Sequence, residues 1–340
     1  MAERAFTAGR SLLYTVAATV ALALGGLLAP TWLLFLLTMS FAQGLAVLGV
    51  VHLPRAGGAT FGQGMFFAVG AYAAALLPQV TGVHDVLVRV AVGTVAAGVL
   101  AVVFAPLLSR YRGIFFAMLT LALSMVLFGL LSKTDALGGS DGFSVTRGTL
   151  LGMQFAAERK DYALFVLSLV LTTAAAWAML AHWHSAAGLV SQAVRSNGLR
   201  VEYLGASARM SLGIAFTVSA MLGGLGGSLT ALVLGHVEPN MTNWTTSGEF
   251  VFVAVLAGYR SVVAVFGASV LLEIVRSFSS LYFPNTWQLA LGLFLLLVIV
   301  LRPDGLGSLW AARRPGTKPV EASPQAAAAV PLAEPGKSAP

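Results

Sequence analysis

The chain has 340 residues, of which 58% are hydrophobic and only 10% are charged, and its mean hydropathy is +0.86. Soluble domains carry about 25% charged residues, so this composition indicates a polytopic membrane protein rather than a large soluble core. The formal charge of +7 fits basic cytoplasmic loops better than nucleic-acid binding. The chain has no cysteine, which excludes disulfides and thiolate metal sites.

A spanning helix needs roughly 20 mostly apolar residues, and ten stretches of the sequence approach that length. The first follows Arg4 and Arg10 as a signal peptide would, but its apolar run is long and lacks a clear small-residue cleavage site, so we interpret it as a retained helix. We therefore predict an all-α, polytopic integral membrane protein with about ten transmembrane segments. They lie at residues 11–28, 31–51, 61–78, 86–108, 114–131, 161–183, 211–235, 244–258, 262–281 and 286–301.

Two of these segments are irregular. Segment 61–78 contains Gly62, Gly64 and Gly70, and segment 244–258 is short and precedes a second apolar run. Irregular backbone is tolerated at membrane depth only where it is buried in protein or lines a cavity. We expect Gly-broken or re-entrant helices at both places.

The basic residues predict the orientation of the chain. With ten crossings and an inside N-terminus, 14 of the 20 Lys and Arg residues lie on the cytoplasmic side. Arg89 and Arg276 fall within segments, and the outside receives only Lys133, Arg147, Arg159 and Lys160. Because basic residues concentrate in cytoplasmic loops, both termini are expected to be cytoplasmic.

The same interpretation divides the chain into a transmembrane domain over residues 1–310 and a tail over residues 311–340. The tail is rich in Pro and Ala and poor in large apolar residues, which predicts a disordered cytoplasmic segment. Within the domain, residues 132–160 form an outside loop, and residues 188–210 form part of an inside loop.

The inside loop reads GLVSQAVRSNGLRVEYLGASARM, and its apolar residues recur at helical spacing. We expect two short helical pieces with a bend at Gly198 and a C-terminal cap at Gly205. The predicted apolar stripe consists of Val190, Val194, Val201 and Leu204. Such a helix either lies on anionic lipid or docks in the groove of a cytoplasmic partner, and the pattern alone favours lipid.

Several stretches resemble the LivM-like subunit of branched-chain amino-acid ABC importer permeases. They are ATFGQGMFFAVGAYAAAL (59–76), RYRGIFFAMLTLALSMVL (110–127), GGSDGF (138–143), AFTVSAMLGGLGGSLTALVLGHVEP (215–239) and LRPDGLGS (301–308). The inside loop is similar to that family's cytoplasmic segment at Ala193, Val194, Arg195, Leu204 and Gly205. The chain departs from the family pattern at Gln63, where a His is usual, and at Ser196-Asn197-Gly198, where an acidic stretch is usual.

The resemblance implies a transport permease rather than an enzyme, located in the bacterial inner membrane. It also implies four kinds of partner: a second, LivH-like permease subunit, two cytoplasmic ATPase subunits, a periplasmic or lipid-anchored binding protein, and membrane lipids. The chain contains no G-x-x-x-x-G-K-[ST] phosphate loop, so ATP is expected on the ATPase subunits and no cofactor on this chain. The alternatives left open are an ion-coupled secondary transporter of small solutes and a permease of the same family for urea or short amides.

Individual residues receive roles from this interpretation, with no metal site among them. The ATPase-coupling residues are Val194, Arg195, Arg200, Leu204 and Gly205. The translocation-path residues are Gln63, Gly64, Phe67 and Tyr72. The helix-packing pair is Gly223 and Gly227, which form a G-x-x-x-G spacing.

Two further features leave alternatives open. Asp141 in the outside loop is either a turn residue or a contact for the binding protein. Glu273 and Arg276 share one helical face, so they form a salt bridge, within the chain or between subunits, or else contact a zwitterionic solute. The pattern favours the salt bridge.

Overall fold

The computed structural model describes residues 15–146, 148–149, 157–258, 261–282, 286–301 and 307. The predicted tail at 311–340 therefore lies outside the described residues. The helices are Thr15–Gly26, α2 (Thr31–His52), α3 (Gln63–Thr81), α4 (Val86–Leu108), α5 (Ile114–Lys133), α6 (Ala157–His184), α7 (Ala186–Tyr203), α8 (Ala208–Leu234), α9 (Trp244–Ala257), α10 (Val262–Tyr282) and α11 (Trp287–Leu301). The short elements are the 3₁₀ turns η1 (Leu53–Ala56), η2 (Asp135–Leu137) and η3 (Pro239–Thr242) and the strands β1 (Phe143–Ser144) and β2 (His236–Val237).

The chain is an all-α polytopic membrane protein, and each of the ten predicted segments coincides with a helix. Seven described helices are long and apolar enough to cross a membrane: α2 to α6, α8 and α10. The helix Thr15–Gly26 and α9 are apolar but shorter. Helix α6 begins at Ala157, so the outside loop predicted to end at 160 is shorter than expected.

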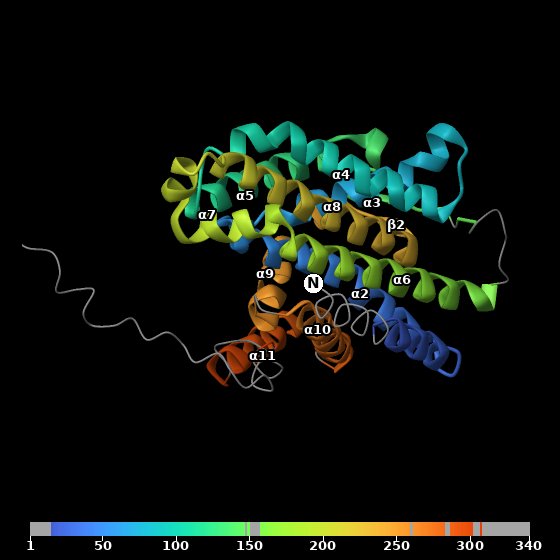
Figure 1. The fold of residues 1–340 in the computed structure, drawn as a ribbon. Helices are drawn as coiled ribbons and strands as arrows, with labels where there is room; N and C mark the ends of the chain where they lie inside the picture. Colours follow the sequence, from blue (N-terminus) through green and yellow to red (C-terminus); the bar gives the residue numbers. More distant parts are fainter. Residues whose placement is uncertain are drawn as a thin grey trace, which may run out of the picture.

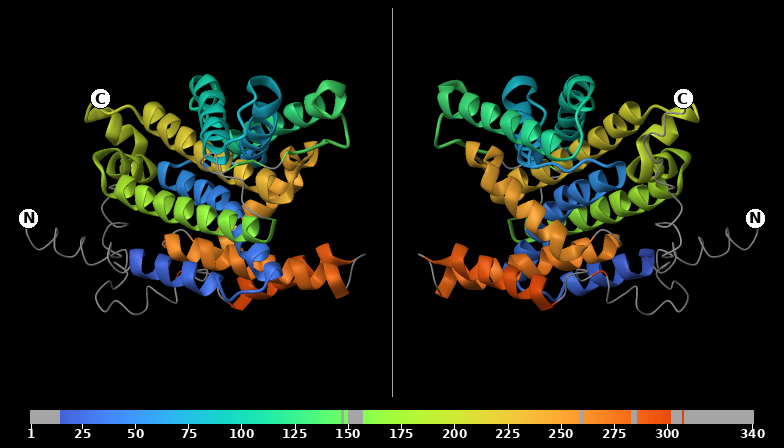
Figure 2. Two further views of the ribbon diagram at one scale, coloured as in Figure 1. Left: turned by 90° about the vertical axis from the view of Figure 1, so that its right-hand side faces the viewer. Right: turned by 90° about the vertical axis from the view of Figure 1, so that its left-hand side faces the viewer.

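Helices α2 and α8 form the centre of the bundle. Helix α2 is the most enclosed of the seven long spans, and it packs against α8, α10 and α6. Helix α8 in turn packs against α3 and α4. Helices α10 and α11 lie on the opposite side of the molecule from α4 and α5 (Figures 1 and 2).

Glycines allow α8 to approach α3 closely. A Cβ at Gly227 would overlap the carbonyl oxygen of Phe67, and a Cβ at Gly223 would lie 2.8 Å from Nε2 of Gln63. Gly223 and Gly227, which the sequence predicts as a packing pair, therefore lie where α3 contacts α8. Neither position has room for a methyl group. Close approach of this kind is how membrane helices gain packing energy in an apolar solvent.

The two irregular segments both begin inside the bundle. Helix α3 starts at Gln63, whose side chain bonds to Ala46, so the start lies about 9 Å inside the end of α2 at His52. Helix α9 starts next to it, since the amide of Gly64 donates to Oγ of Ser247 at 2.9 Å.

Helix α5 supplies hydroxyl groups to the backbone just before α3 and just before α9. The amide of Phe61 donates to Oγ1 of Thr120 at 3.4 Å, and Oγ of Ser124 donates to the carbonyl of Thr242 at 2.7 Å. Both hydroxyl residues are fully buried and lie one helical turn apart. Polar backbone at membrane depth is thereby satisfied inside the protein, as an apolar solvent requires.

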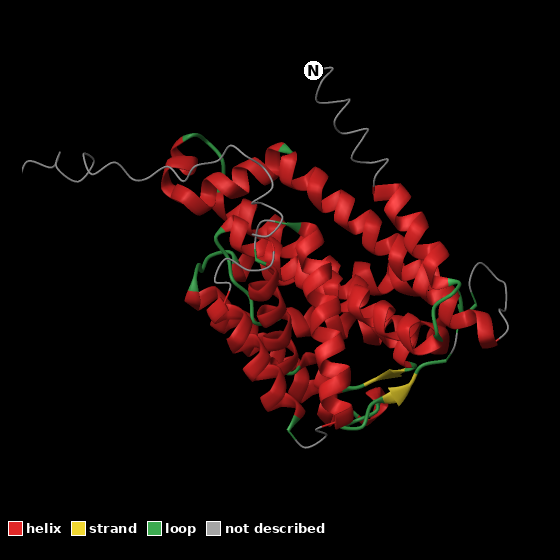
Figure 3. Cartoon of the chain, turned by 90° about the horizontal axis from the view of Figure 1, so that it is seen from below, coloured by secondary structure: helices red, strands yellow, loops and turns green. Residues whose placement is uncertain are grey.

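The molecule has two distinct ends, which Figure 1 shows at α7 and β2. They are joined by α8, whose 27 residues are about 40 Å long. At the β2 end, β1 and β2 pair antiparallel through Phe143 with Val237 and Ser144 with His236. Figure 3 shows these strands at one edge of an otherwise helical chain.

Candidate functional site

Helix α7 crosses one end of the bundle in two pieces. Its N-cap Ser185 accepts a hydrogen bond from the amide of Gly188, and its backbone leaves helical geometry at Asn197 (φ −158°, ψ 96°). Oδ1 of Asn197 accepts from the amide of Arg200 at 3.0 Å, so Asn197 caps the second piece. The predicted bend is confirmed, one residue before Gly198.

The second piece of α7 ends in a glycine cap. Gly205 has φ +86°, the amide of Gly205 donates to the carbonyl of Glu202 at 3.0 Å, and the amide of Ala206 donates to that of Val201 at 3.2 Å. These two bonds form a Schellman motif, which satisfies carbonyls at the helix end. The predicted C-terminal cap at Gly205 is confirmed.

Replacing Gly205 with alanine should loosen this end of α7. A side chain in the left-handed region costs about 1–2 kcal/mol, so we expect amide hydrogen exchange at residues 205 and 206 to accelerate roughly five- to thirty-fold. Gly213→Ala serves as the control, because its Cβ would make an ordinary contact with Cβ of Ala105 at 3.7 Å. Equal exchange rates in the two variants would contradict the strained cap.

The apolar stripe of α7 is confirmed only in part. Val194 and Val201 are buried with Ala208, and Val190 packs against them. Leu204 is instead 81% exposed, so its predicted place in the stripe is wrong. The break at Asn197 shifts the helical phase, and Leu204 is the C-cap with non-helical backbone, so its side chain leaves the buried face.

The opposite face of α7 carries large exposed apolar side chains. Leu199, Tyr203 and Leu204 are 69%, 90% and 81% exposed. The predicted coupling residues Arg195 and Arg200 are also exposed. The region around the bend of α7 therefore presents an apolar and basic surface. We call it the α7 surface and define it by Arg195 at the end of the first piece and by Leu199, Arg200, Tyr203 and Leu204 of the second.

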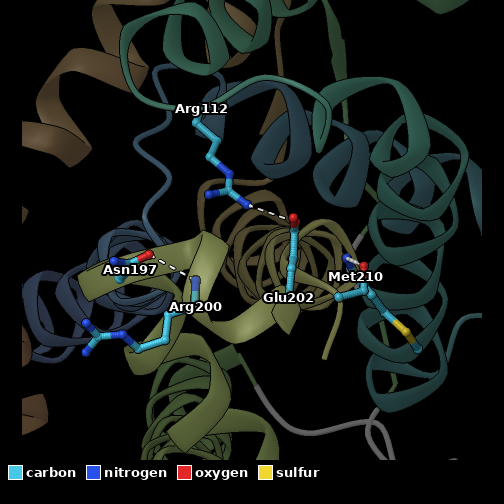
Figure 4. Close-up of polar contacts among 6 residues, drawn as sticks. Arg112, Asn197, Arg200, Glu202 and Met210 are labelled. Carbon is cyan, nitrogen blue, oxygen red and sulfur yellow. Dashed lines mark hydrogen bonds and ion pairs between the residues drawn. The ribbon is translucent and has the colours of Figure 1, made fainter. Parts of the chain in front are cut away.

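Contacts with Arg112 and with α8 fix the position of α7. Nη2 of Arg112, from the turn before α5, lies 3.9 Å from Oε1 of Glu202 (Figure 4). A Cβ at Gly198 would overlap the Arg112 guanidinium, so the glycine makes room for this contact. Oγ of Ser191 hydrogen-bonds to Oγ of Ser211 at 3.0 Å.

Arg112 explains part of the sequence departure at Ser196-Asn197-Gly198. Asn197 caps a helix, and Gly198 accommodates an arginine from another part of the chain. The sequence pattern alone indicates no role for Arg112, and its position in RYRG is the only signal that the sequence offers.

The junction of α6 and α7 is held by a buried aromatic contact. Nε1 of Trp183 donates to Nδ1 of His52 at 3.0 Å, and the Arg55 guanidinium lies 3.5 Å from the centre of a Trp183 ring. A cation over an indole ring is a favourable contact, most of all where water is excluded. These contacts join the end of α2 and η1 to the last turn of α6, just before α7 begins.

The four predicted translocation-path residues are all buried within this chain. Nε2 of Gln63 donates to the carbonyls of Ala46 and Ser219, and Oγ of Ser219 donates to its Oε1 at 3.2 Å. Gln63 thus bonds to both central helices, α2 and α8. Whether it also contacts a solute stays a prediction.

The other three path residues extend along α3 toward the β2 end. Gly64 contacts Ser247 at the start of α9, and the ring of Phe67 lies 5.1 Å from that of Phe250. Tyr72 stacks edge-on against Phe143 at 5.8 Å. These contacts place α3 between α9 and the loop that joins α5 to α6, and the role of its residues in transport stays a prediction.

Asp141 is exposed at the β2 end. Its carboxylate accepts from Oγ of Ser140 at 3.0 Å, and its carbonyl lies 3.1 Å from Nε2 of His236. A Cβ at Gly142 would overlap the carbonyl of Val237, so the turn fits tightly against β2. Asp141 therefore lies in a turn and its side chain is accessible, and its contact with a binding protein stays a prediction.

Among the described residues, no group of three or more His, Asp or Glu side chains could hold a metal ion. The structure also shows two charged residues that the sequence pattern does not place in a site. Arg89 is fully buried at the β2 end of α4, and Glu249 of α9 forms an ion pair with Arg276.

The fold and the α7 surface define the class: a multi-pass, all-α membrane protein with an amphipathic helix across one end. The model of the family described as branched-chain amino acid transport system / permease component matches residues 32–301, and the chain belongs to this family. This membership confirms the resemblance found in the sequence motifs.

Two curated relatives are similar to this chain. Both are described as high-affinity branched-chain amino acid transport system permease protein LivM, from Escherichia coli (strain K12) and Salmonella typhimurium. Each is 29% identical over 267 residues, which are 72% of this chain. The chain spans only 62% of the length of these relatives. No solved structure matches the chain.

Proposed function

We propose that the chain is a permease subunit of an ATP-driven ABC importer for branched-chain or related hydrophobic amino acids. Membership in the permease family and the names of the two LivM relatives support this function. The observation that carries the proposal is the α7 surface, since Leu199, Tyr203 and Leu204 are exposed beside two arginines. An apolar and basic helix face of this kind suits a groove on a partner protein.

The proposal assigns the two ends of the molecule to the two sides of the inner membrane. The α7 end and both termini face the cytoplasm, where a pair of ATPase subunits binds the α7 surface and holds ATP. The β2 end faces outward, where Asp141 and the outer loop contact the binding protein. The basic residues support this orientation, because Arg112, Arg195 and Arg200 cluster at the α7 end.

Transport in this scheme proceeds by alternating access between this chain and a second permease subunit. Closure of the ATPases displaces the α7 surface, and α7 is tied to α8 through Ser191 and Ser211 and to the start of α5 through Arg112. Movement of α7 therefore reaches the helices that surround the broken start of α3. These connections provide a physical route from ATP to the membrane segment.

The function is tested by reconstituting the chain with its ATPases, partner permease and binding protein, and measuring leucine uptake into vesicles. We expect uptake that requires ATP and every subunit. Urea and acetamide, added as competitors, should leave leucine uptake unchanged if amino acids are the substrate class. Uptake by this chain alone, driven by a proton gradient, would contradict the proposal and favour an ion-coupled transporter.

A further inference from the structure

Three charged side chains lie together at the depth of the membrane on α9 and α10. Nη1 of Arg276 donates to Oε2 of Glu249 at 3.2 Å, which joins the two helices. Glu273 lies one turn before Arg276 on α10, about 16 Å from Val262 and about 14 Å from Tyr282. Its carboxylate is therefore near the middle of the span, where a charge is most costly.

These groups are not enclosed by the chain itself. The side chains of Arg276 and Glu249 are 34% and 25% exposed. Partly exposed charges, even when paired, are unfavourable against hydrocarbon, because no water solvates them there. This part of the α9–α10 surface must therefore be covered by another subunit or line an aqueous cavity.

Glu273 has unused hydrogen-bonding capacity. Its Oε2 atom is buried and has no hydrogen-bond partner among the described residues, whereas Glu249 accepts from Arg276. Glu273 and Arg276 share one face of α10, one helical turn apart. With both carboxylates ionised, the three groups carry a net charge of −1, which one further cation would balance.

Arg89 shows how the same chain treats a charge that serves packing. It is fully buried one turn inside α4, where Nε donates to the carbonyl of Ala74 and Nη1 to that of Thr146, both at 2.8 Å. Those bonds attach the outer loop to α3 and α4. Its Nη2 atom, like Oε2 of Glu273, has no hydrogen-bond partner among the described residues, so an unpaired atom alone does not distinguish the two sites. The Glu249–Arg276–Glu273 group differs because it is partly exposed, lies deeper and has an excess of negative charge.

We define the α9–α10 face as the surface that carries Glu249 and Phe252 of α9 and Glu273 and Arg276 of α10. We propose that this face lines the translocation cavity and that Glu273 binds the α-ammonium group of the passing amino acid. The inference rests on the proposed function and specifies the solute chemistry of its path: a primary ammonium next to an apolar side chain. Arg276 and Glu249 hold the two helices in place around Glu273. Phe252, 49% exposed and three residues after Glu249 on the same face of α9, provides apolar contact for the aliphatic part.

The first test measures leucine uptake and ATP hydrolysis in the complete reconstituted importer carrying Glu273→Gln. The amide keeps the size of the side chain but removes its charge, so uptake should fall roughly tenfold or more, as expected for the loss of a charged hydrogen bond. ATP hydrolysis stimulated by the binding protein should remain near the wild-type rate, so more ATP is consumed per leucine. Glu273→Asp should recover part of the uptake.

The control for this test is Asp161→Asn, which neutralises an exposed carboxylate near the start of α6. It should transport normally. Wild-type uptake in Glu273→Gln would overturn the proposal. A parallel loss of ATP hydrolysis and thermal stability in Glu273→Gln would also overturn it, because that result would mark a structural role.

The second test does not depend on transport and uses the absence of cysteine in the chain. In the assembled importer, Phe252→Cys should react with a water-soluble maleimide, and millimolar leucine should slow the reaction. Val99→Cys is the control, since Val99 is 58% exposed in the middle of α4, on a surface that we expect to face lipid.

An unreactive Phe252→Cys in an importer that transports leucine would overturn the cavity assignment alone. A reactive, leucine-protected cysteine in a complex without ATP-dependent uptake would contradict the proposed function and leave the cavity assignment standing. The two conclusions are therefore tested separately.

Discussion

Gly227→Ala is expected to destabilise the membrane domain, because it places a methyl group against backbone at the centre of the bundle. The new Cβ would overlap the carbonyl oxygen of Phe67, a backbone atom that cannot rotate away, so α3 and α8 must separate. Overpacking of this kind costs about 1–3 kcal/mol or more. We expect a lower melting midpoint and a smaller folded fraction in detergent, measured by size-exclusion chromatography after heating.

Gly248→Ala is the matched control for this prediction. Gly248 is also buried and helical, but a Cβ at this position would have no atom within 4 Å. Alanine favours helix by about 0.5–1 kcal/mol over glycine, so this variant should be as stable as the wild type or slightly more so. Equal melting midpoints for the two variants would show that the contact between Gly227 and Phe67 is not needed for stability.

In the proposed importer, charge reversal on the α7 surface should uncouple this chain from the ATPase subunits. In the double variant Arg195→Glu and Arg200→Glu, two exposed cations become anions without a change in any buried contact of α7. Reversed charges at an interface repel the partner, so we expect copurification of the ATPases and leucine uptake to fall by about tenfold or more. Membrane insertion and the melting midpoint of the permease should not change.

Arg110→Glu is the control for general electrostatics at this end of the molecule. Arg110 is exposed in the turn between α4 and α5 but does not belong to the α7 surface. It should retain most of the copurification. Normal association of the ATPases with the double variant, together with weaker binding of the isolated permease to anionic lipid, would assign α7 to the membrane interface instead.

The predictions that succeeded depend on physics that acts locally along the chain. A lipid solvent forces nearly every backbone group into a helix and fixes the helix length, so apolar runs alone located the ten segments. Gly198 and Gly205 marked the bend and the end of α7, because helix breaking and left-handed backbone depend on the residue itself and its neighbours.

The predictions that failed or were missed depend on contacts between distant residues. Gln63 is bonded to Ser219, 156 positions away, and no local pattern indicates that pairing. Helical spacing places Arg276 beside Glu273 on α10, but it gives no sign of the ion pair between Arg276 and Glu249 on α9. Leu204 was predicted to be part of the buried apolar stripe, but it is exposed because the bend in the backbone changes the direction of its side chain.

The sequence by itself determined that this protein is an all-helical membrane protein of the branched-chain amino acid permease family, since composition, segment length and ordered family motifs are properties of the chain alone. Only the tertiary structure decided which side chains of α7 remain exposed, which glycines contact α3, and where the intramembrane charges meet. Those outcomes depend on how helices pack in three dimensions, because burial and ion pairing are set by neighbours that the order of residues does not specify.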